Sequence, residues 1–116
     1  MVIRKFEEII AWQRARELTN LIYRKFFKLH DFEFRKQICR ASVSIMNNVA
    51  EGYERMGNKE FIKFLFISKG SCSEVRSMLY LALDLKYINN SEFDLLYKLT
   101  IEISKLLSGF IKTLKT

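Results

Sequence analysis

Apolar residues recur at alternating spacings of three and four in four successive blocks of the chain, 12–29, 34–52, 61–82 and 93–114. This alternation keeps one side of a helix with about 3.6 residues per turn facing its neighbour. It is typical of helices that pack nearly parallel or antiparallel. The pattern predicts an all-α protein with four helices at about 7–29, 32–55, 58–86 and 91–114.

Side chains that cap helix N-termini stand at the breaks between these blocks. Asp31 precedes the second block, Asn58 the third, and the Asn-Asn-Ser run at 89–91 the fourth. Gly57 can adopt the positive φ of a helix C-cap. Connections this short predict an antiparallel, up-down-up-down four-helix bundle, formed as a single domain by residues 1–116.

The third predicted helix carries apolar side chains around almost its whole circumference. In the run 60–68 only Lys63 clearly points elsewhere. An isolated bundle buries one face of each helix, and a helix that is hydrophobic all round needs a second partner. We therefore expect a homo-oligomer, with Ile62, Phe66 and Ile67 as candidate interface residues.

Composition bears on the secondary structure and the cellular location of the chain. It has no proline and four glycines, which favours long uninterrupted helices. Cys39 and Cys72 share no metal-ligand or redox spacing, so we expect two buried, reduced thiols. No run approaches the ~20 apolar residues that span a bilayer, and no signal peptide is visible. The expectation is a cytoplasmic protein with no membrane partner.

The charge balance suggests an anionic partner. There are 20 Lys and Arg against 13 Asp and Glu, a net charge of +7 that suits RNA binding but also plain solubility. On the first helix Arg14, Lys25 and Lys28 fall within about 60° of one another, and Arg24 lies close beside them. These four residues are the candidate nucleic-acid-binding residues; a solvated helix face is the alternative.

Catalytic chemistry finds little support in the sequence. A single histidine, His30, excludes the Glu-x-x-His pairs of di-iron bundles, and no glycine-rich phosphate loop is present. Arg24 and His30 are five residues apart, within the Arg-x4-6-His spacing of helical-bundle ribonucleases, but such a pair often arises by chance. We predict no enzymatic activity, no cofactor or metal and no small-molecule substrate, and keep a ribonuclease using Arg24 and His30 as a remote alternative.

Polar side chains lie on or beside faces of the second and third helices that should be buried. Because buried polar groups must be paired, we interpret them as a structural network that sets helix register; a polar binding cleft is the alternative. We expect ion pairs between Arg40 and Glu74 and between Arg55 and Glu51. The predicted network comprises Arg40, Ser44, Asn48, Glu51, Arg55, Ser71 and Glu74.

Two glycines fall inside these same helices. A glycine in an exposed helix interior costs up to about 1 kcal/mol relative to alanine. We therefore expect that Gly52 and Gly70 mark places where two helices approach closely.

Three stretches carry a family resemblance. They are Trp-Gln-x-Ala at 12–15, Ser-Ile-x-Asn-Asn-Val-Ala-Glu-Gly at 44–52, and Phe-x-x-Phe-Leu-x-Ile-Ser-x-Gly-Ser-x-x-Glu at 61–74. Through them the chain resembles, over nearly its whole length, the "four helix bundle protein" family. Its members are also called 23S rRNA intervening-sequence proteins, because some are encoded inside insertions in bacterial large-subunit rRNA genes.

The resemblance implies a fold, an assembly and a set of partners. The fold is an antiparallel four-helix bundle, and the assembly is a barrel-like homopentameric ring. It also implies kinship with the accessory variability protein of diversity-generating retroelements, whose basic pentamer binds the reverse transcriptase and nucleic acid. No enzymatic activity is associated with the family, and most members have no known role. The family's usual proline after Ser-Ile is replaced here by Met46, which should straighten the second helix.

These expectations combine into one functional hypothesis. The protein is a non-enzymatic homo-oligomer, a pentamer by resemblance, which contacts rRNA or another structured nucleic acid through a basic surface. The alternative is an adaptor for other proteins, such as a nucleic-acid enzyme, or a retroelement accessory factor, without RNA affinity of its own.

Overall fold

Four helices account for most of the chain and pack around one apolar core, which confirms the predicted all-α class. The computed structural model describes residues 2–115. A short 3-10 turn, η1 (Phe6–Glu8), precedes α1 (Ile10–Phe26), α2 (Phe32–Glu54), α3 (Asn58–Asp84) and α4 (Asn90–Leu114). Helices α1 and α3 each contact both α2 and α4, in a bundle of 44 × 22 × 19 Å.

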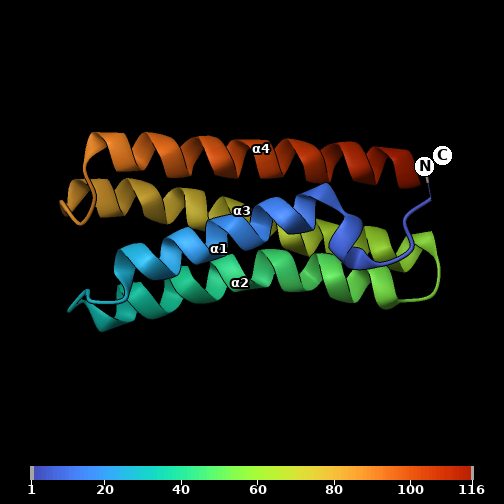
Figure 1. Ribbon diagram of the computed structural model, residues 1–116, viewed down its shortest axis with the longest axis horizontal. Helices are drawn as coiled ribbons and strands as arrows, with labels where there is room; N and C mark the ends of the chain where they lie inside the picture. The colour runs from blue at the N-terminus through green and yellow to red at the C-terminus, as the bar shows by residue number, and fades with distance from the viewer. Residues whose placement is uncertain (1, 116) are drawn as a thin grey trace.

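The connections gather at the two ends of the bundle. Figure 1 shows the α1–α2 and α3–α4 connections at one end, and the α2–α3 connection with both chain ends at the other. At the first end the Tyr87 hydroxyl donates to Asp31 Oδ2 at 2.6 Å. At the second the Tyr53 hydroxyl donates to the Ile3 carbonyl at 2.8 Å. Each end therefore has a tyrosine that joins segments distant in sequence.

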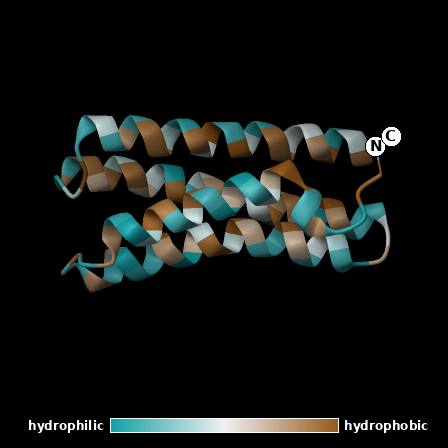
Figure 2. Ribbon diagram, viewed as in Figure 1, coloured by the Kyte–Doolittle hydropathy of each residue, from teal (hydrophilic) through white to brown (hydrophobic). Residues whose placement is uncertain are grey.

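The core follows the 3–4 pattern of apolar residues. Figure 2 shows apolar and polar segments alternating along each helix, so that every helix has a stripe to bury. On α2, Val49 is fully buried, whereas its neighbour Asn48, a member of the predicted polar network, is half-buried. Each large apolar side chain in the core contributes about 1.5–3 kcal/mol by leaving water. The largest fully buried ones include Leu18, Ile22, Ile38, Ile45, Leu65, Leu79, Ile103 and Leu107.

Five helix ends differ from the predicted bounds. Helix α1 ends at Phe26 and not at residue 29, α2 ends at Glu54 and not at residue 55, and α4 begins at Asn90 and not at residue 91. Helix α1 begins at Ile10 and not at residue 7, because Ile9 has extended backbone (φ −76°, ψ 120°) and buries its side chain with only 2% exposed. Helix α3 ends at Asp84 and not at residue 86, because Lys86 takes a left-handed φ of 63°. In both cases the backbone leaves the helix so that the chain can turn onto the core.

The predicted caps are confirmed at two of three starts. Asp31 Oδ1 accepts from the Phe34 amide at 3.2 Å. Asn89 and Glu92 form a reciprocal capping box at α4. The prediction is wrong for Asn58, which is the first residue of α3 and not its cap. Gly57 is the N-cap there and has the predicted positive φ, 89°, but at the start of α3 and not at the end of α2.

The two helix-interior glycines behave differently. A Cβ built on Gly52 would lie 2.6 Å from Phe64 Cβ and 2.9 Å from Phe61 Cδ1, so the predicted close approach of α2 and α3 is confirmed there. The same prediction is wrong for Gly70. That residue is exposed on α3, and nothing in the chain lies within 4 Å of a Cβ built on it.

Candidate nucleic-acid interface

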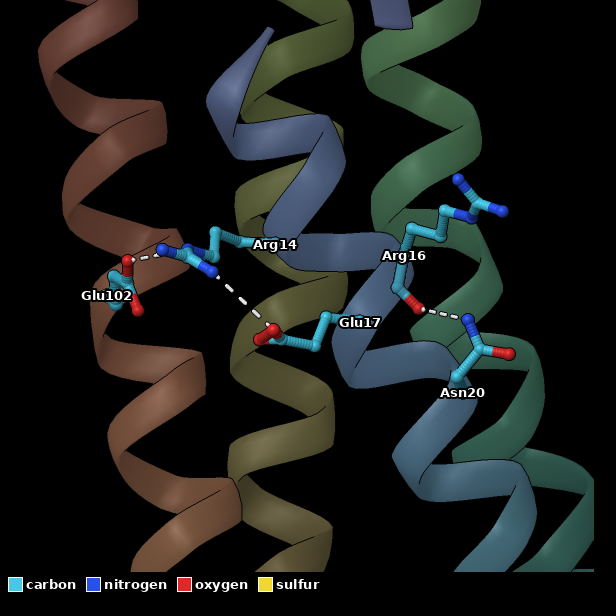
Figure 3. Close-up of polar contacts among 5 residues, drawn as sticks. All are labelled: Arg14, Arg16, Glu17, Asn20 and Glu102. Carbon is cyan, nitrogen blue, oxygen red and sulfur yellow. Dashed lines mark hydrogen bonds and ion pairs between the residues drawn. The ribbon is translucent and has the colours of Figure 1, made fainter.

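The basic residues predicted on the first helix do not form one free patch. Arg14 Nε donates to Glu102 Oε2 on α4 at 3.0 Å, and Arg14 Nη1 lies 3.5 Å from Glu17 Oε2. Figure 3 shows the Arg14 side chain reaching toward α4, whereas Arg16 leaves α1 on the other side, toward α2. Two carboxylates therefore offset the charge of Arg14.

Lys25 is also engaged. Its Nζ lies 2.5 Å from Glu92 Oε2 on α4. The hydrogen bond from Lys25, followed by that from the Asn89 amide, lowers the pKa of Glu92 below its usual value. The same carboxylate therefore closes the α4 capping box and neutralises a cation of α1. Surface ion pairs of this kind add little stability, about 0–1 kcal/mol, but they reduce the charge offered to a phosphate.

The other two candidates are exposed and take part in none of these ion pairs, although Arg24 lines the same groove as Lys25 and Glu92. Arg24 lines a shallow groove between α1 and α4 together with Leu21 and Leu95. Lys28 Nζ lies 5.4 Å from the centre of the Phe27 ring. His30 is exposed in the α1–α2 connection, and within residues 2–115 no hydrogen bond or ion pair joins it to Arg24.

The predicted polar network divides into a half-buried centre and an exposed rim. At the centre, the Ser44 and Ser71 hydroxyls are 2.8 Å apart across α2 and α3. Asn48 Nδ2 donates to the Ser44 carbonyl at 2.8 Å and to its hydroxyl at 2.9 Å. Every buried side-chain nitrogen and oxygen among the described residues has a partner. This centre joins α2 to α3.

The rim of that network is solvated. Arg55 Nη2 donates to Glu51 Oε2 at 2.8 Å, so the expected i,i+4 pair is present, with both side chains about half exposed. The expected Arg40–Glu74 pair is not formed among the described residues; both side chains are exposed.

Buried hydroxyls that the predicted network omitted bridge the helices more directly. Ser68 Oγ on α3 donates to the Ile45 carbonyl of α2 at 2.7 Å. Thr19 Oγ1 on α1 donates to the Ser42 carbonyl of α2 at 3.0 Å and to its own helix at Ala15. Small hydroxyl residues on an apolar stripe were the available signal for these contacts, because such a side chain can satisfy itself on a backbone carbonyl.

Both cysteines are buried and free, as predicted. Burial is the main cause that raises the pKa of Cys72, to about 11, and its Sγ donates to the Thr100 carbonyl at 3.2 Å. Burial also raises the pKa of Cys39.

Within residues 2–115 no three His, Cys, Asp or Glu side chains are grouped as a metal site requires. None of the described helices combines the length and apolar character needed to cross a bilayer.

The candidate oligomer residues are only partly free. Phe66 and Ile67 are 50% and 52% exposed, as predicted. Ile62 is partly buried against the core of its own chain and is therefore less exposed than the other two, and its place in an interface stays a prediction. The part of this apolar stretch that is exposed is therefore smaller than the sequence suggested, because the core of the same chain already covers part of Ile62.

Sequence reasoning missed a groove between the end of α1 and the start of α2. Tyr23, Phe27 and Phe32 are exposed along it, together with the basic residues Arg35 and Lys36. The sequence did contain a sign of this groove. Phe27 and Phe32 lie next to the apolar stripe of buried residues on their helices and not on it. An aromatic residue next to the buried stripe must face outward.

Comparisons with known proteins agree on the family. The family model described as 23S rRNA-intervening sequence protein matches residues 7–109. The chain is similar to a crystal structure from Bacteroides thetaiotaomicron, of a protein with unknown function from the S23 ribosomal protein family. The two share 26% sequence identity with a TM-score of 0.82, over 88% of this chain and 98% of the other. None of the curated proteins matches the chain.

Proposed function

The chain belongs to the 23S rRNA-intervening sequence protein family, and from this premise we propose that it is a non-enzymatic binding protein that assembles with itself and contacts RNA. In the proposed assembly, up-down-up-down bundles are the subunits of a homopentameric ring. The basic exterior of the ring contacts rRNA or another structured RNA.

The observation that carries the proposed assembly is the outward face of α3. Large apolar side chains along and just after this helix are about half exposed: Phe66, Ile67, Tyr80, Leu81 and Leu85. Single exposed apolar residues are ordinary, but a series along one helix is typical of a surface that another chain covers. Gly70 lies on the same helix between the two ends of the series, and no atom of its own chain fills the space beside it. An exposed helix-interior glycine costs about 1 kcal/mol relative to alanine, and close approach of a second subunit would explain it.

The proposed RNA contact rests on how few cations are neutralised. In the described part of the chain, ion pairs engage Arg14, Lys25 and Arg55, whereas the full sequence has 20 Lys and Arg. On α4, three exposed lysines recur every seven residues and stand outside these ion pairs: Lys98, Lys105 and Lys112. At ~1.5 Å of rise per residue they lie about 10 Å apart along the helix. Each subunit of a ring would repeat this line of charge, which strengthens the field on a polyanion.

Light scattering tests the assembly. The expected mass is five times the 13.8 kDa of the chain. Replacing Phe66 and Ile67 together by serine should lower the mass toward that of one chain. Leu95→Ser is the matched control, because Leu95 is 60% exposed but lies on α4. A wild-type mass near 13.8 kDa would contradict the proposed assembly.

Titration with structured RNA at two salt concentrations tests the binding. Replacing Lys98, Lys105 and Lys112 by glutamine should weaken binding and reduce the slope of log affinity against log salt by about 2. The control replaces Arg14 and Lys25, whose charges are already offset by carboxylates, and should weaken binding less per charge removed. Wild-type protein that binds no RNA would favour the protein-adaptor alternative. RNA recovered intact from the same samples would dispose of the ribonuclease alternative.

A further inference from the structure

We propose that the groove between the end of α1 and the start of α2 binds an unpaired RNA nucleotide. In this proposal the base stacks on the exposed aromatic rings, and the flanking phosphates contact the cations around them. The inference rests on the proposed RNA binding and locates one RNA contact in this groove. Arg14, Arg24 and Lys25, the candidates on α1, do not line the groove.

The groove gathers aromatic side chains that the core leaves outside. Tyr23, Phe27 and Phe32 are 47%, 60% and 57% exposed and line one groove of about 320 Å³. Their neighbours Phe26 and Phe34 pack edge to face inside the core, with ring centres 5.4 Å apart. The three exposed rings lie outside that core cluster, and their exposed surface is available to a planar partner.

Arg35 is held in place over these rings. Its Nη1 donates to the Phe27 carbonyl at 2.8 Å, and its guanidinium carbon lies 5.0 Å from the centre of the Phe32 ring. A backbone carbonyl, and not a carboxylate, fixes this side chain, so its positive charge is not neutralised. A planar guanidinium positioned beside an aromatic ring suits both stacking and bidentate contact with a phosphate.

No carboxylate lines the groove among the described residues, although the exposed Glu33 follows Phe32 in the sequence. Among the described residues that line it, Arg35 and Lys36 are the charged ones, and Lys28 lies over the Phe27 ring just outside. Asp31 is in the connection between the two helices, but its oxygens accept from the Phe34 amide and the Tyr87 hydroxyl. This carboxylate is therefore occupied within the fold and does not compete with a phosphate.

The same combination of cation and ring continues along α1. Arg16 leaves α1 toward α2, as Figure 3 shows, and its guanidinium carbon lies 5.7 Å from the centre of the Trp12 ring. Arg16 precedes Tyr23 by seven residues, so both lie on the side of α1 that borders α2. A strand leaving the groove would thus meet further positive charge along the helix.

The chemistry selects unpaired nucleotides over a duplex. Rings that stand free in a groove can stack only on a base whose face is free, and a duplex hides its base faces between neighbours. A volume of about 320 Å³ is also at the lower end of small-ligand pockets, which span roughly 300–1,000 Å³. This volume has room for a base.

Fluorescence anisotropy with two labelled probes of equal length tests the inference: a single-stranded uridine dodecamer and a twelve-base-pair RNA duplex. The variant Phe27→Leu with Phe32→Leu keeps apolar surface but removes the stacking rings. It should bind the single strand at least about tenfold more weakly and the duplex less than about twofold more weakly. Arg35→Lys keeps the charge and should also reduce single-strand binding alone. The control, Met56→Ala, removes an apolar side chain that is 94% exposed in the α2–α3 connection, outside both the groove and the α3 face, and should leave both affinities unchanged.

The outcomes separate this inference from the proposed function. Suppose that wild-type protein binds both probes, and that the leucine variant keeps both affinities or loses them to the same extent. The groove then does not stack bases, whereas the proposed RNA binding stands. If wild-type protein binds neither probe, both proposals fail. If the leucine variant changes the mass in light scattering, the groove is a contact between subunits and the inference is overturned. Circular dichroism that matches wild type shows that the variants are folded, and Arg35→Lys provides the same test without altering any ring.

Discussion

Gly52→Ala sets two physical effects against each other at one position. Alanine is the better helix former by about 1 kcal/mol, so propensity alone predicts a more stable α2. The new Cβ, however, would lie 2.6 Å from Phe64 Cβ and 2.9 Å from the Phe61 ring. The first of these atoms is attached directly to the α3 backbone, so α2 and α3 must move apart. Overpacking of this kind costs about 1–3 kcal/mol, so after the gain in helix propensity we expect a net loss of about 0–2 kcal/mol in the free energy of unfolding.

Gly109→Ala is the matched control for that experiment. Gly109 lies inside α4, is exposed, and has no atom within 4 Å of a built Cβ. Only the propensity effect remains there, so the control should gain about 0.5–1 kcal/mol. Both variants are unfolded in urea at the same protein concentration, because self-association makes stability concentration-dependent. If Gly52→Ala is as stable as the control, the close approach of α2 and α3 does not limit the fold.

Three further predictions concern single contacts. Tyr87→Phe should destabilise the protein at pH 7, because the hydrogen bond from the Tyr87 hydroxyl, together with that from the Phe34 amide, lowers the pKa of Asp31. The difference in stability between wild type and variant should disappear as the pH falls below about 4 and Asp31 is protonated. Urea unfolding that gives the same difference at pH 7 and pH 3 would contradict this. Asn89→Ala should cost about 1 kcal/mol by removing the α4 cap, whereas Asn90→Ala, one residue inside the helix, should cost less in the same assay. Because burial raises the pKa of Cys72 to about 11, its thiol should resist alkylation at pH 8 until urea unfolds the chain, and rapid labelling in the native state, followed by mass spectrometry, would oppose this.

Local chemistry made much of the fold predictable. The periodicity of apolar residues reports which side of a helix is buried, and it depends only on neighbours within a few turns. The caps at Asp31 and Asn89 are equally local, since each side chain bonds an amide three residues ahead. The close approach at Gly52 was predicted because a glycine that costs helix stability is favoured where a side chain has no room, but the same reasoning failed at Gly70.

The candidate site was less predictable because charge compensation across helices depends on their mutual rotation and register. Arg14 and Lys25 stand on one side of α1 in any helix, but only the packing of α4 places Glu102 and Glu92 against them. The expected Arg40–Glu74 pair failed for the same reason, since both side chains point into solvent.

The sequence by itself determined that the chain makes four helices, roughly where each begins and which stripe of each is buried, because these properties follow from short-range periodicity and capping. Only the tertiary structure decided which surfaces remain free. In the folded chain Ile62 packs partly against the core, and no atom fills the space beside Gly70. Lys25 on α1 forms an ion pair with Glu92, and Phe27, Phe32 and Arg35 line one groove. These outcomes depend on distances between residues remote in sequence, which no local pattern encodes.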